Sequence, residues 1–130
     1  MSHSPALTLT TVNLGAADPP ALARFYQRLL GWRPDPRDED GDHSWIVMRN
    51  PAGGVGLAFQ YEEFHSRPVW PGRPGEQQMM MHLEIKVDDL DAGLRHALDC
   101  GATLAKFQPQ QDVRVCLDPE GHPFCLWIEG

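Results

Sequence analysis

An internal repeat is the feature that most restricts how this chain can fold. Residues 11–32 and 82–103 follow one plan: an alternating run, an aspartate seven positions after its first residue, and a helical segment that ends at a glycine. A second shared pattern follows each copy, Asn-Pro-Ala-Gly at 50–53 and Asp-Pro-Glu-Gly at 118–121, and an apolar run comes after each. Such self-similarity indicates two modules built alike.

Local patterns predict the elements of each module. Alternating residues at 7–15 and 80–87 indicate half-buried strands. Asp18 is expected to cap the first helix, while Gly31 and Gly101 are expected to end the two helices. Further strands are expected at 32–35, 45–49 and 55–61 in the first half and at 103–108, 113–117 and 124–129 in the second. The predicted fold is therefore α+β, with two tandem βαβββ modules.

The segment 62–78 connects the modules and contains three prolines and two glycines. A loop of this length in a compact domain is commonly functional, and its Phe64 and Trp70 predict that it packs against the rest of the protein. The length of 130 residues fits one domain. We expect module one at about 7–61, this connecting loop, and module two at about 79–130.

These landmarks resemble the vicinal oxygen chelate superfamily, which includes glyoxalase I, extradiol dioxygenases and bleomycin-resistance proteins. The residues that carry the resemblance are Asp18, Phe25-Tyr26, Leu30-Gly31, Met81-His82-Leu83, Asp88-Asp89-Leu90, Gly101-Ala102 and Asp118–Phe124. The resemblance implies a single glyoxalase-like domain whose strands form an open half-barrel with a pocket between the modules. It also implies a homodimer.

In enzymes of that superfamily, four strand positions, usually histidine or glutamate, hold a divalent metal. The resemblance carries these positions onto Thr11, Gln60, His82 and Cys125, with Ala58 as the alternative to Gln60. Threonine, glutamine and alanine are poor ligands for Zn²⁺ or Fe²⁺. We therefore expect no metal cofactor, with His82 as the only strong candidate ligand.

Candidate ligand-binding residues lie on the strand faces that should line the pocket. His82 shares a face with Glu84, and its side chain could bind a ligand, hold a metal or stay solvated. Aromatic side chains form good walls for planar or cationic ligands. The residues expected to bind ligand are Thr11, Trp45, Gln60, Trp70, His82, Glu84, Cys125 and Trp127, and no catalytic residue is assigned.

Charge and cysteine content exclude several classes of partner. The formal net charge of −7 argues against nucleic acid, which requires a basic surface. No apolar run is long enough to cross a membrane, and the first residues do not resemble a signal peptide.

We expect a cytoplasmic protein, in which the three cysteines are free thiols. A disulfide between Cys116 and Cys125 is a less favoured alternative.

The preferred function is non-catalytic sequestration of an aromatic or cationic natural product, such as an antibiotic, as in bleomycin-resistance proteins. The weak metal positions, the tryptophans and the acidic charge favour it. The alternative is a metal-dependent or metal-free lyase, isomerase or dioxygenase of the same superfamily. A third possibility is a domain that acts through protein contacts.

Overall fold

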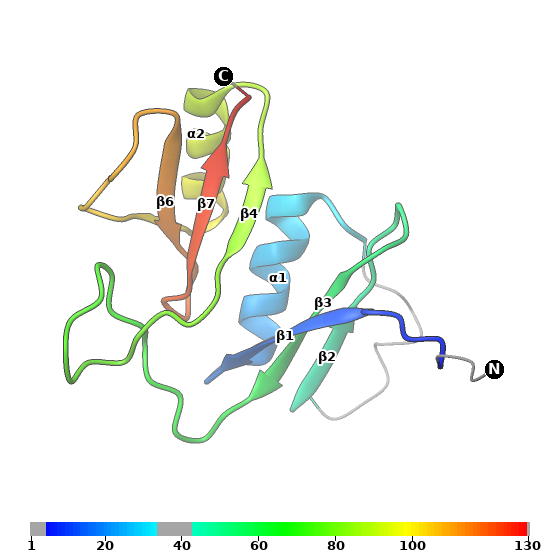
Figure 1. Ribbon diagram of the computed structural model, residues 1–130. Helices are drawn as coiled ribbons and strands as arrows, with labels where there is room; N and C mark the ends of the chain where they lie inside the picture. Colours follow the sequence, from blue (N-terminus) through cyan, green and yellow to red (C-terminus); the bar gives the residue numbers. More distant parts are fainter. Residues whose placement is uncertain (1–4, 34–42, 130) are drawn as a thin grey trace.

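The computed structural model describes residues 5–33 and 43–129, which form two similar modules (Figure 1). Each module has an open sheet with one helix on one of its faces. The elements are β1 (Thr11–Ala16), α1 (Pro19–Leu30), β2 (Trp45–Met48), β3 (Gly56–Tyr61), β4 (Leu83–Lys86), α2 (Leu90–Cys100), β5 (Thr103–Leu104), β6 (Val113–Leu117) and β7 (Pro123–Trp127). The predicted α+β fold of two modules is confirmed.

The strand register shows how closely the modules match. The strand order is β1-β3-β2 in module one and β4-β7-β6-β5 in module two. The first and last strands of each module pair in parallel, with Val12 opposite Leu57 and Leu83 opposite Phe124. The neighbouring strand is antiparallel in both sheets. The repeat in the sequence therefore corresponds to a repeat in three dimensions.

Both helices begin and end as their capping residues predict. The side chain of Asp18 accepts a hydrogen bond from the Ala21 amide at 3.2 Å, and that of Asp89 accepts one from the Ala92 amide at 3.0 Å. Gly31 and Gly101 end the helices in the left-handed conformation, which is readily accessible only to glycine.

Six predicted strands are shorter in the structure, β2 and β3 by one residue each. β1 starts at Thr11 because residues 7–10 lie outside the sheet, with Leu7 87% exposed. β4 starts at Leu83, since the register would set His82 against Pro123, whose nitrogen has no hydrogen to donate. β7 ends at Trp127. The strand expected at 32–35 lies partly outside the described residues.

β5 has two residues instead of the six predicted. Its pairing with β6 is continued by a side chain. The Gln108 amide accepts a hydrogen bond from the Val115 nitrogen at 2.8 Å and donates one to the Val115 oxygen at 2.9 Å. The Val115 oxygen also accepts the Ala105 amide at 3.0 Å, so the Gln108 side chain chiefly satisfies the Val115 amide, which a longer β5 would have bonded.

One apolar core joins the modules. The apolar spacing of Leu22, Phe25 and Tyr26 predicts one buried face of α1; all three are buried, and the Phe25 ring centroid lies 5.9 Å from that of Phe124 on β7. The same spacing in α2 predicts a buried face of Leu90, Leu94, Ala97 and Leu98, and this is corrected at one position: Leu98 is 41% exposed, whereas Cys100 is buried. The buried stripe of α2 turns toward α1, against which it packs.

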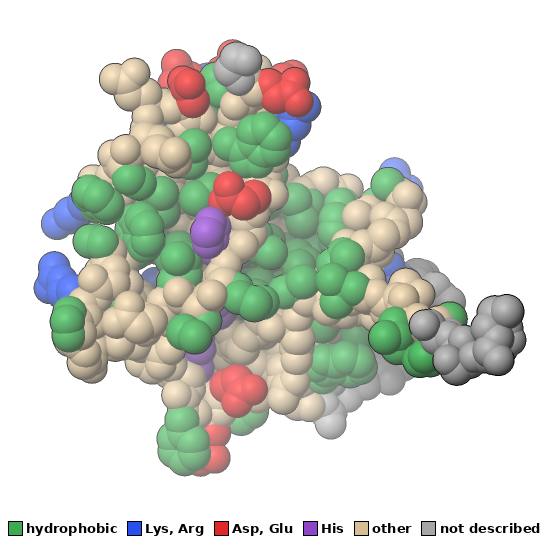
Figure 2. All heavy atoms as spheres, in the orientation of Figure 1, with side chains coloured by type: hydrophobic (Ala, Val, Ile, Leu, Met, Phe, Trp, Pro, Cys, Tyr) green, Lys and Arg blue, Asp and Glu red, His purple; other side chains and the backbone are tan. Residues whose placement is uncertain are grey.

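The remaining sheet faces are open. Figure 2 shows hydrophobic side chains across much of the surface on which both sheets lie. Cys116 lies opposite Phe124, and Cys125 lies opposite Val115, so the two thiols point to opposite sheet faces and stay free. No helix among the described residues is long and apolar enough to cross a membrane.

Candidate functional site

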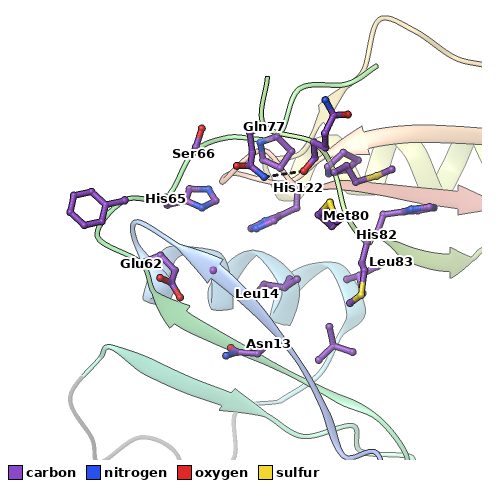
Figure 3. Close-up of a pocket in the computed structure, with 18 of the residues that line it drawn as sticks. Asn13, Leu14, Glu62, His65, Ser66, Gln77, Met80, His82, Leu83 and His122 are labelled. Atoms are coloured by element: carbon purple, nitrogen blue, oxygen red, sulfur yellow. Dashed lines mark hydrogen bonds between the residues drawn. The ribbon is translucent and has the colours of Figure 1, made fainter. Parts of the chain in front are cut away.

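A cavity of about 500 Å³ lies between β1 and the segment that connects the modules. One wall is β1, from Val12 to Gly15, and the opposite wall is formed by residues of 62–68 and 77–83. His122 and Pro123 close it where β7 begins (Figure 3). The expected pocket between modules therefore includes the connecting segment as one of its walls.

Much of the cavity wall is apolar. Val12 and Leu14 contribute from β1, while Phe64 and Pro68 contribute from the connecting segment. The run Met79–Met81 lines the same space. Methionine side chains are flexible and polarizable, so this wall can adapt to ligands of different shape.

The polar lining has a consistent character. Glu62, His65, His82 and His122 all contribute side chains, and the described lining residues include no lysine or arginine. The Glu62 side chain packs against β1 at Gly15, where there is no side chain. Any larger residue would place its Cβ only 2.9 Å from Glu62 Cγ, which is too close for a carbon–carbon contact. Asn13, Ser66, Gln77 and Gln78 line the cavity as well and can both donate and accept hydrogen bonds. The lining therefore carries the negative charge of Glu62 without a lysine or arginine among its described residues.

Three hydrogen bonds fasten the connecting segment to module two. His65 Nε2 lies 2.9 Å from the Glu120 carbonyl oxygen. Arg67 Nη1 donates to the Pro119 carbonyl at 2.7 Å, and Trp70 Nε1 donates to the Phe107 carbonyl at 3.2 Å. The segment is thus a fixed wall of the cavity, and the prediction that it packs against the protein agrees with these contacts.

A buried carboxylate, Asp118, lies behind the histidines and is 1% exposed. It accepts hydrogen bonds from the Tyr26 hydroxyl at 2.8 Å and from the amides of Glu120 at 2.9 Å and His122 at 3.0 Å. Burial raises the pKa of Tyr26 well above its ordinary value, and the charge and hydrogen bond of Asp118 raise it further. Tyr26 therefore remains a neutral donor to this carboxylate.

The neighbouring Glu120 is also nearly buried, at 7% exposure. Its two carboxylate oxygens accept from the amides of Ala17 and Asp18, at 2.9 and 3.0 Å. The Asp-Pro-Glu-Gly turn of module two therefore holds the chain just before α1 of module one. In the corresponding turn of module one, the Asn50 side chain accepts from the Ala52 amide at 3.0 Å.

Potential metal ligands gather on the open face of module two. The donor atoms of His82, Glu84 and Cys125 all lie within 4.8 Å of one another. His82 Nε2 is 2.9 Å from Glu84 Oε2. Burial raises the pKa of the Cys125 thiol to about 12, and its hydrogen bond to Glu84 and the charge of Glu84 contribute. Imidazole, carboxylate and thiolate are all ligands that zinc accepts.

Module one does not complete this set. Asn13 lies opposite Ala58, the pairing that corresponds to Glu84 opposite Cys125 in module two. The register thus favours Ala58 over Gln60 as the counterpart of Cys125. Gln60 instead accepts a hydrogen bond from Asn13 Nδ2 at 2.6 Å. The four metal positions implied by the resemblance are therefore not all filled by metal ligands, and any site would depend on module two.

The three tryptophans proposed as ligand walls lie outside the cavity lining. Trp45 on β2 is 55% exposed. The Trp70 ring is tilted against that of Phe107, with the centroids 6.1 Å apart. The Lys86 ammonium nitrogen lies over the Trp127 ring, 5.8 Å from its centroid. Of the eight residues expected to bind ligand, His82 lines the cavity. Thr11 and Gln60 lie on the module-one sheet, and Glu84 and Cys125 lie on that of module two.

Sequence reasoning did not single out Glu62, His65 or His122. The first two belong to the connecting loop, whose length signalled a functional segment. His122 occupies a position next to the Asp-Pro-Glu-Gly pattern, and its histidine could have been noticed as unlike the corresponding Gly54 of module one. Nothing in the sequence indicated that these three residues lie close to β1.

Comparison with known proteins identifies the family. The sequence model of the glyoxalase-like domain matches residues 10–127, almost the whole chain. This chain belongs to the glyoxalase-like domain family. It is thereby a member of the vicinal oxygen chelate superfamily, as the resemblance implied.

Solved structures with the glyoxalase-like fold agree. A glyoxalase/bleomycin resistance protein/dioxygenase family enzyme from Burkholderia phytofirmans has a TM-score of 0.70 and 21% identity, covering 94% of this chain and 98% of its own. An antibiotic binding protein from a Streptomyces species has a TM-score of 0.62 and 18% identity, and the match covers 98% of this chain and 100% of that protein. None of the curated protein sequences matches this chain.

In this glyoxalase-like domain the cavity and the module-two face are adjacent. His82 belongs to both, because it lines the cavity and also contacts Glu84. A ligand in the cavity could therefore approach the open face of module two. Fold alone does not select between binding and catalysis, since one fold can carry several functions.

Proposed function

We propose that this protein binds and sequesters a small amphipathic organic molecule in the cavity between its modules, without converting it. The class we favour is an aromatic or cationic natural product, such as an antibiotic. The observation that supports this proposal is the cavity itself, which has a volume of about 500 Å³ and a mainly apolar lining interrupted by several polar side chains. Small-molecule sites typically have these properties and this size.

The charge of the lining supports a neutral or cationic ligand. Glu62 contributes a carboxylate, and the part of the lining that the structure describes has no lysine or arginine to neutralise it. The net charge of −7 would attract a cation at low salt. The solved antibiotic binding protein of similar fold adds support for this class of ligand.

The test is a thermal-shift screen with aromatic and cationic antibiotics, followed by calorimetry on each compound that raises Tm. A Met79→Trp variant, which places a larger side chain at the half-buried methionine of the cavity lining, should abolish binding. Leu98→Trp, at an exposed position of α2, should bind normally. Mass spectrometry of the released compound should find it unchanged. Absence of any binder, or conversion of the compound, would reject sequestration.

A second candidate is a metal-dependent lyase, isomerase or dioxygenase, favoured by the cluster of His82, Glu84 and Cys125. These residues would hold a divalent ion, which would supply Lewis-acid chemistry beside the cavity. Elemental mass spectrometry of tag-free protein distinguishes the candidates. Stoichiometric zinc, iron, manganese or nickel, lost in a Cys125→Ser variant, would support the enzyme; protein without metal after incubation and desalting supports sequestration.

We also propose that the protein is a homodimer. Exposed apolar side chains support this, including Trp45, Met80 and Met81, which are 55%, 82% and 74% exposed. Light scattering coupled to size-exclusion chromatography measures the mass directly. A monomer at micromolar concentration would contradict the proposal. The cytoplasmic location stays a prediction.

A further inference from the structure

His122 is held in one tautomer by Asp118. Its Nδ1 atom lies 2.8 and 3.1 Å from the two carboxylate oxygens. That carboxylate also receives the Tyr26 hydroxyl and two backbone amides, so it acts as an acceptor. Nδ1 must then carry the hydrogen, and in the neutral ring Nε2 is left as an unprotonated acceptor.

His65 is held in the opposite tautomer. Its Nε2 atom lies 2.9 Å from the Glu120 carbonyl oxygen, which can only accept. Nε2 must therefore donate, and in the neutral ring Nδ1 is the unprotonated nitrogen. In both neutral rings, the single N–H group therefore already donates to an acceptor within the protein.

The two rings form a pair in the cavity wall. Their centroids are 5.4 Å apart, and their side chains are 11% and 18% exposed. Figure 3 shows them side by side, above Leu14 of β1. Glu62 lines the same end of the cavity. Two imidazole acceptors and a carboxylate therefore lie together, without a lysine or arginine in the described lining.

We propose that His65, His122 and Glu62 form a recognition site for a protonated primary or secondary amine on the sequestered molecule. This inference rests on the proposed function and names the chemical group that the cavity selects. An ammonium group has N–H donors and no acceptor, so it complements two bare nitrogens and a carboxylate. A carboxylate or phosphate would find no donor on the Glu62 carboxylate or on the two unprotonated ring nitrogens. The methionine wall would bury the apolar body of the same molecule.

The test compares three naphthalene probes by calorimetry: naphthylmethylamine, its N,N,N-trimethyl derivative and naphthoic acid. The first two carry the same charge, but only the amine has N–H donors. We expect the amine to bind at least about tenfold more tightly than the trimethyl compound, and the acid to bind least. His65→Gln and His122→Asn should remove that preference, whereas His43→Gln, at an exposed position, should keep it.

The outcomes separate this inference from the proposed function. Equal affinity of the two cations, or a preference unchanged in both histidine variants, would overturn the amine site while leaving sequestration intact. No binding of any probe or antibiotic would reject both. Nitrogen-15 NMR gives a second check without ligand: His122 should be the Nδ1–H tautomer and His65 the Nε2–H tautomer. The reverse assignment for either ring would overturn the inference.

Discussion

The hydroxyl of Tyr26 donates a hydrogen bond of 2.8 Å to Asp118 Oδ2, across 92 positions in the sequence. Tyr26 belongs to α1 of module one, and Asp118 begins the turn before β7 of module two. Both side chains are almost completely buried. The bond therefore joins the two modules behind the cavity, and it holds the carboxylate that orients His122.

Replacing Tyr26 with phenylalanine should destabilise the protein by about 1–3 kcal/mol, because a buried acceptor loses a donor while the ring is kept. Tyr61→Phe is the matched control, since Tyr61 is 49% exposed, and its effect should stay within about 0.5 kcal/mol. Urea unfolding measures both values. Equal stability of the two variants would mean that the Asp118 contact contributes nothing.

Alkaline pH should weaken the wild-type protein through the same residue. Burial and then Asp118 raise the pKa of Tyr26 in the folded state, whereas the unfolded chain ionises near pH 10. The contribution of this neutral tyrosine is thus present below about pH 10 and is lost as the pH rises further. Unfolding between pH 8 and 11 should show a shallower decline for Tyr26→Phe than for Tyr61→Phe. Parallel declines would contradict the prediction.

Glu120→Gln should also destabilise the protein, by about 1–3 kcal/mol. Both carboxylate oxygens accept backbone amides, at Ala17 and Asp18, and the amide of glutamine would turn an N–H toward one of these donors. Glu63→Gln, at an exposed position of the connecting segment, is the control. The denaturant midpoint of Glu120→Gln should be clearly lower than that of Glu63→Gln. Midpoints equal within error would show that the hydrogen bonds of Glu120 do not stabilise the fold.

Gln108→Ala tests the side chain that continues the pairing of β5 with β6. The alanine variant would leave the Val115 amide without its acceptor, while the Val115 carbonyl would keep the Ala105 amide. The loss should cost about 1–3 kcal/mol. Hydrogen exchange at Val115 should also accelerate. Gln110→Ala, at an exposed position, should change neither measurement. Unaltered exchange at Val115 in the first variant would argue against this role.

Glu84→Gln should make Cys125 more reactive. Burial raises the pKa of this thiol to about 12, with further contributions from Glu84, so removal of the carboxylate charge lowers the pKa and increases the thiolate fraction. In protein treated with chelator, the rate of alkylation by iodoacetamide at pH 9 should rise by roughly three- to tenfold. Peptide mapping locates the modification, and Glu63→Gln should leave the rate unchanged. A slower reaction in Glu84→Gln would contradict the conclusion that the Glu84 carboxylate raises the pKa of Cys125.

The sequence by itself determined the fold class and the repeat, because the signals for both are local. Asp18 and Asp89 start the helices through hydrogen bonds to amides three positions later, and Gly31 and Gly101 end them in the left-handed conformation. Alternation predicted the strands, although their ends depended on partners. β4 is shorter than its pattern because Pro123 cannot pair with His82, which no local pattern could reveal.

Only the tertiary structure decided which residues line the cavity. His65 and His122 are 57 positions apart, and each was unremarkable in its own segment. They meet because His65 bonds to Glu120 and because Asp118 holds His122. Trp70, which stood out in its own segment, is not among the residues that line this cavity, and its ring lies 6.1 Å from that of Phe107. Local spacing determines helices and strands, whereas a site between modules depends on packing across the whole chain.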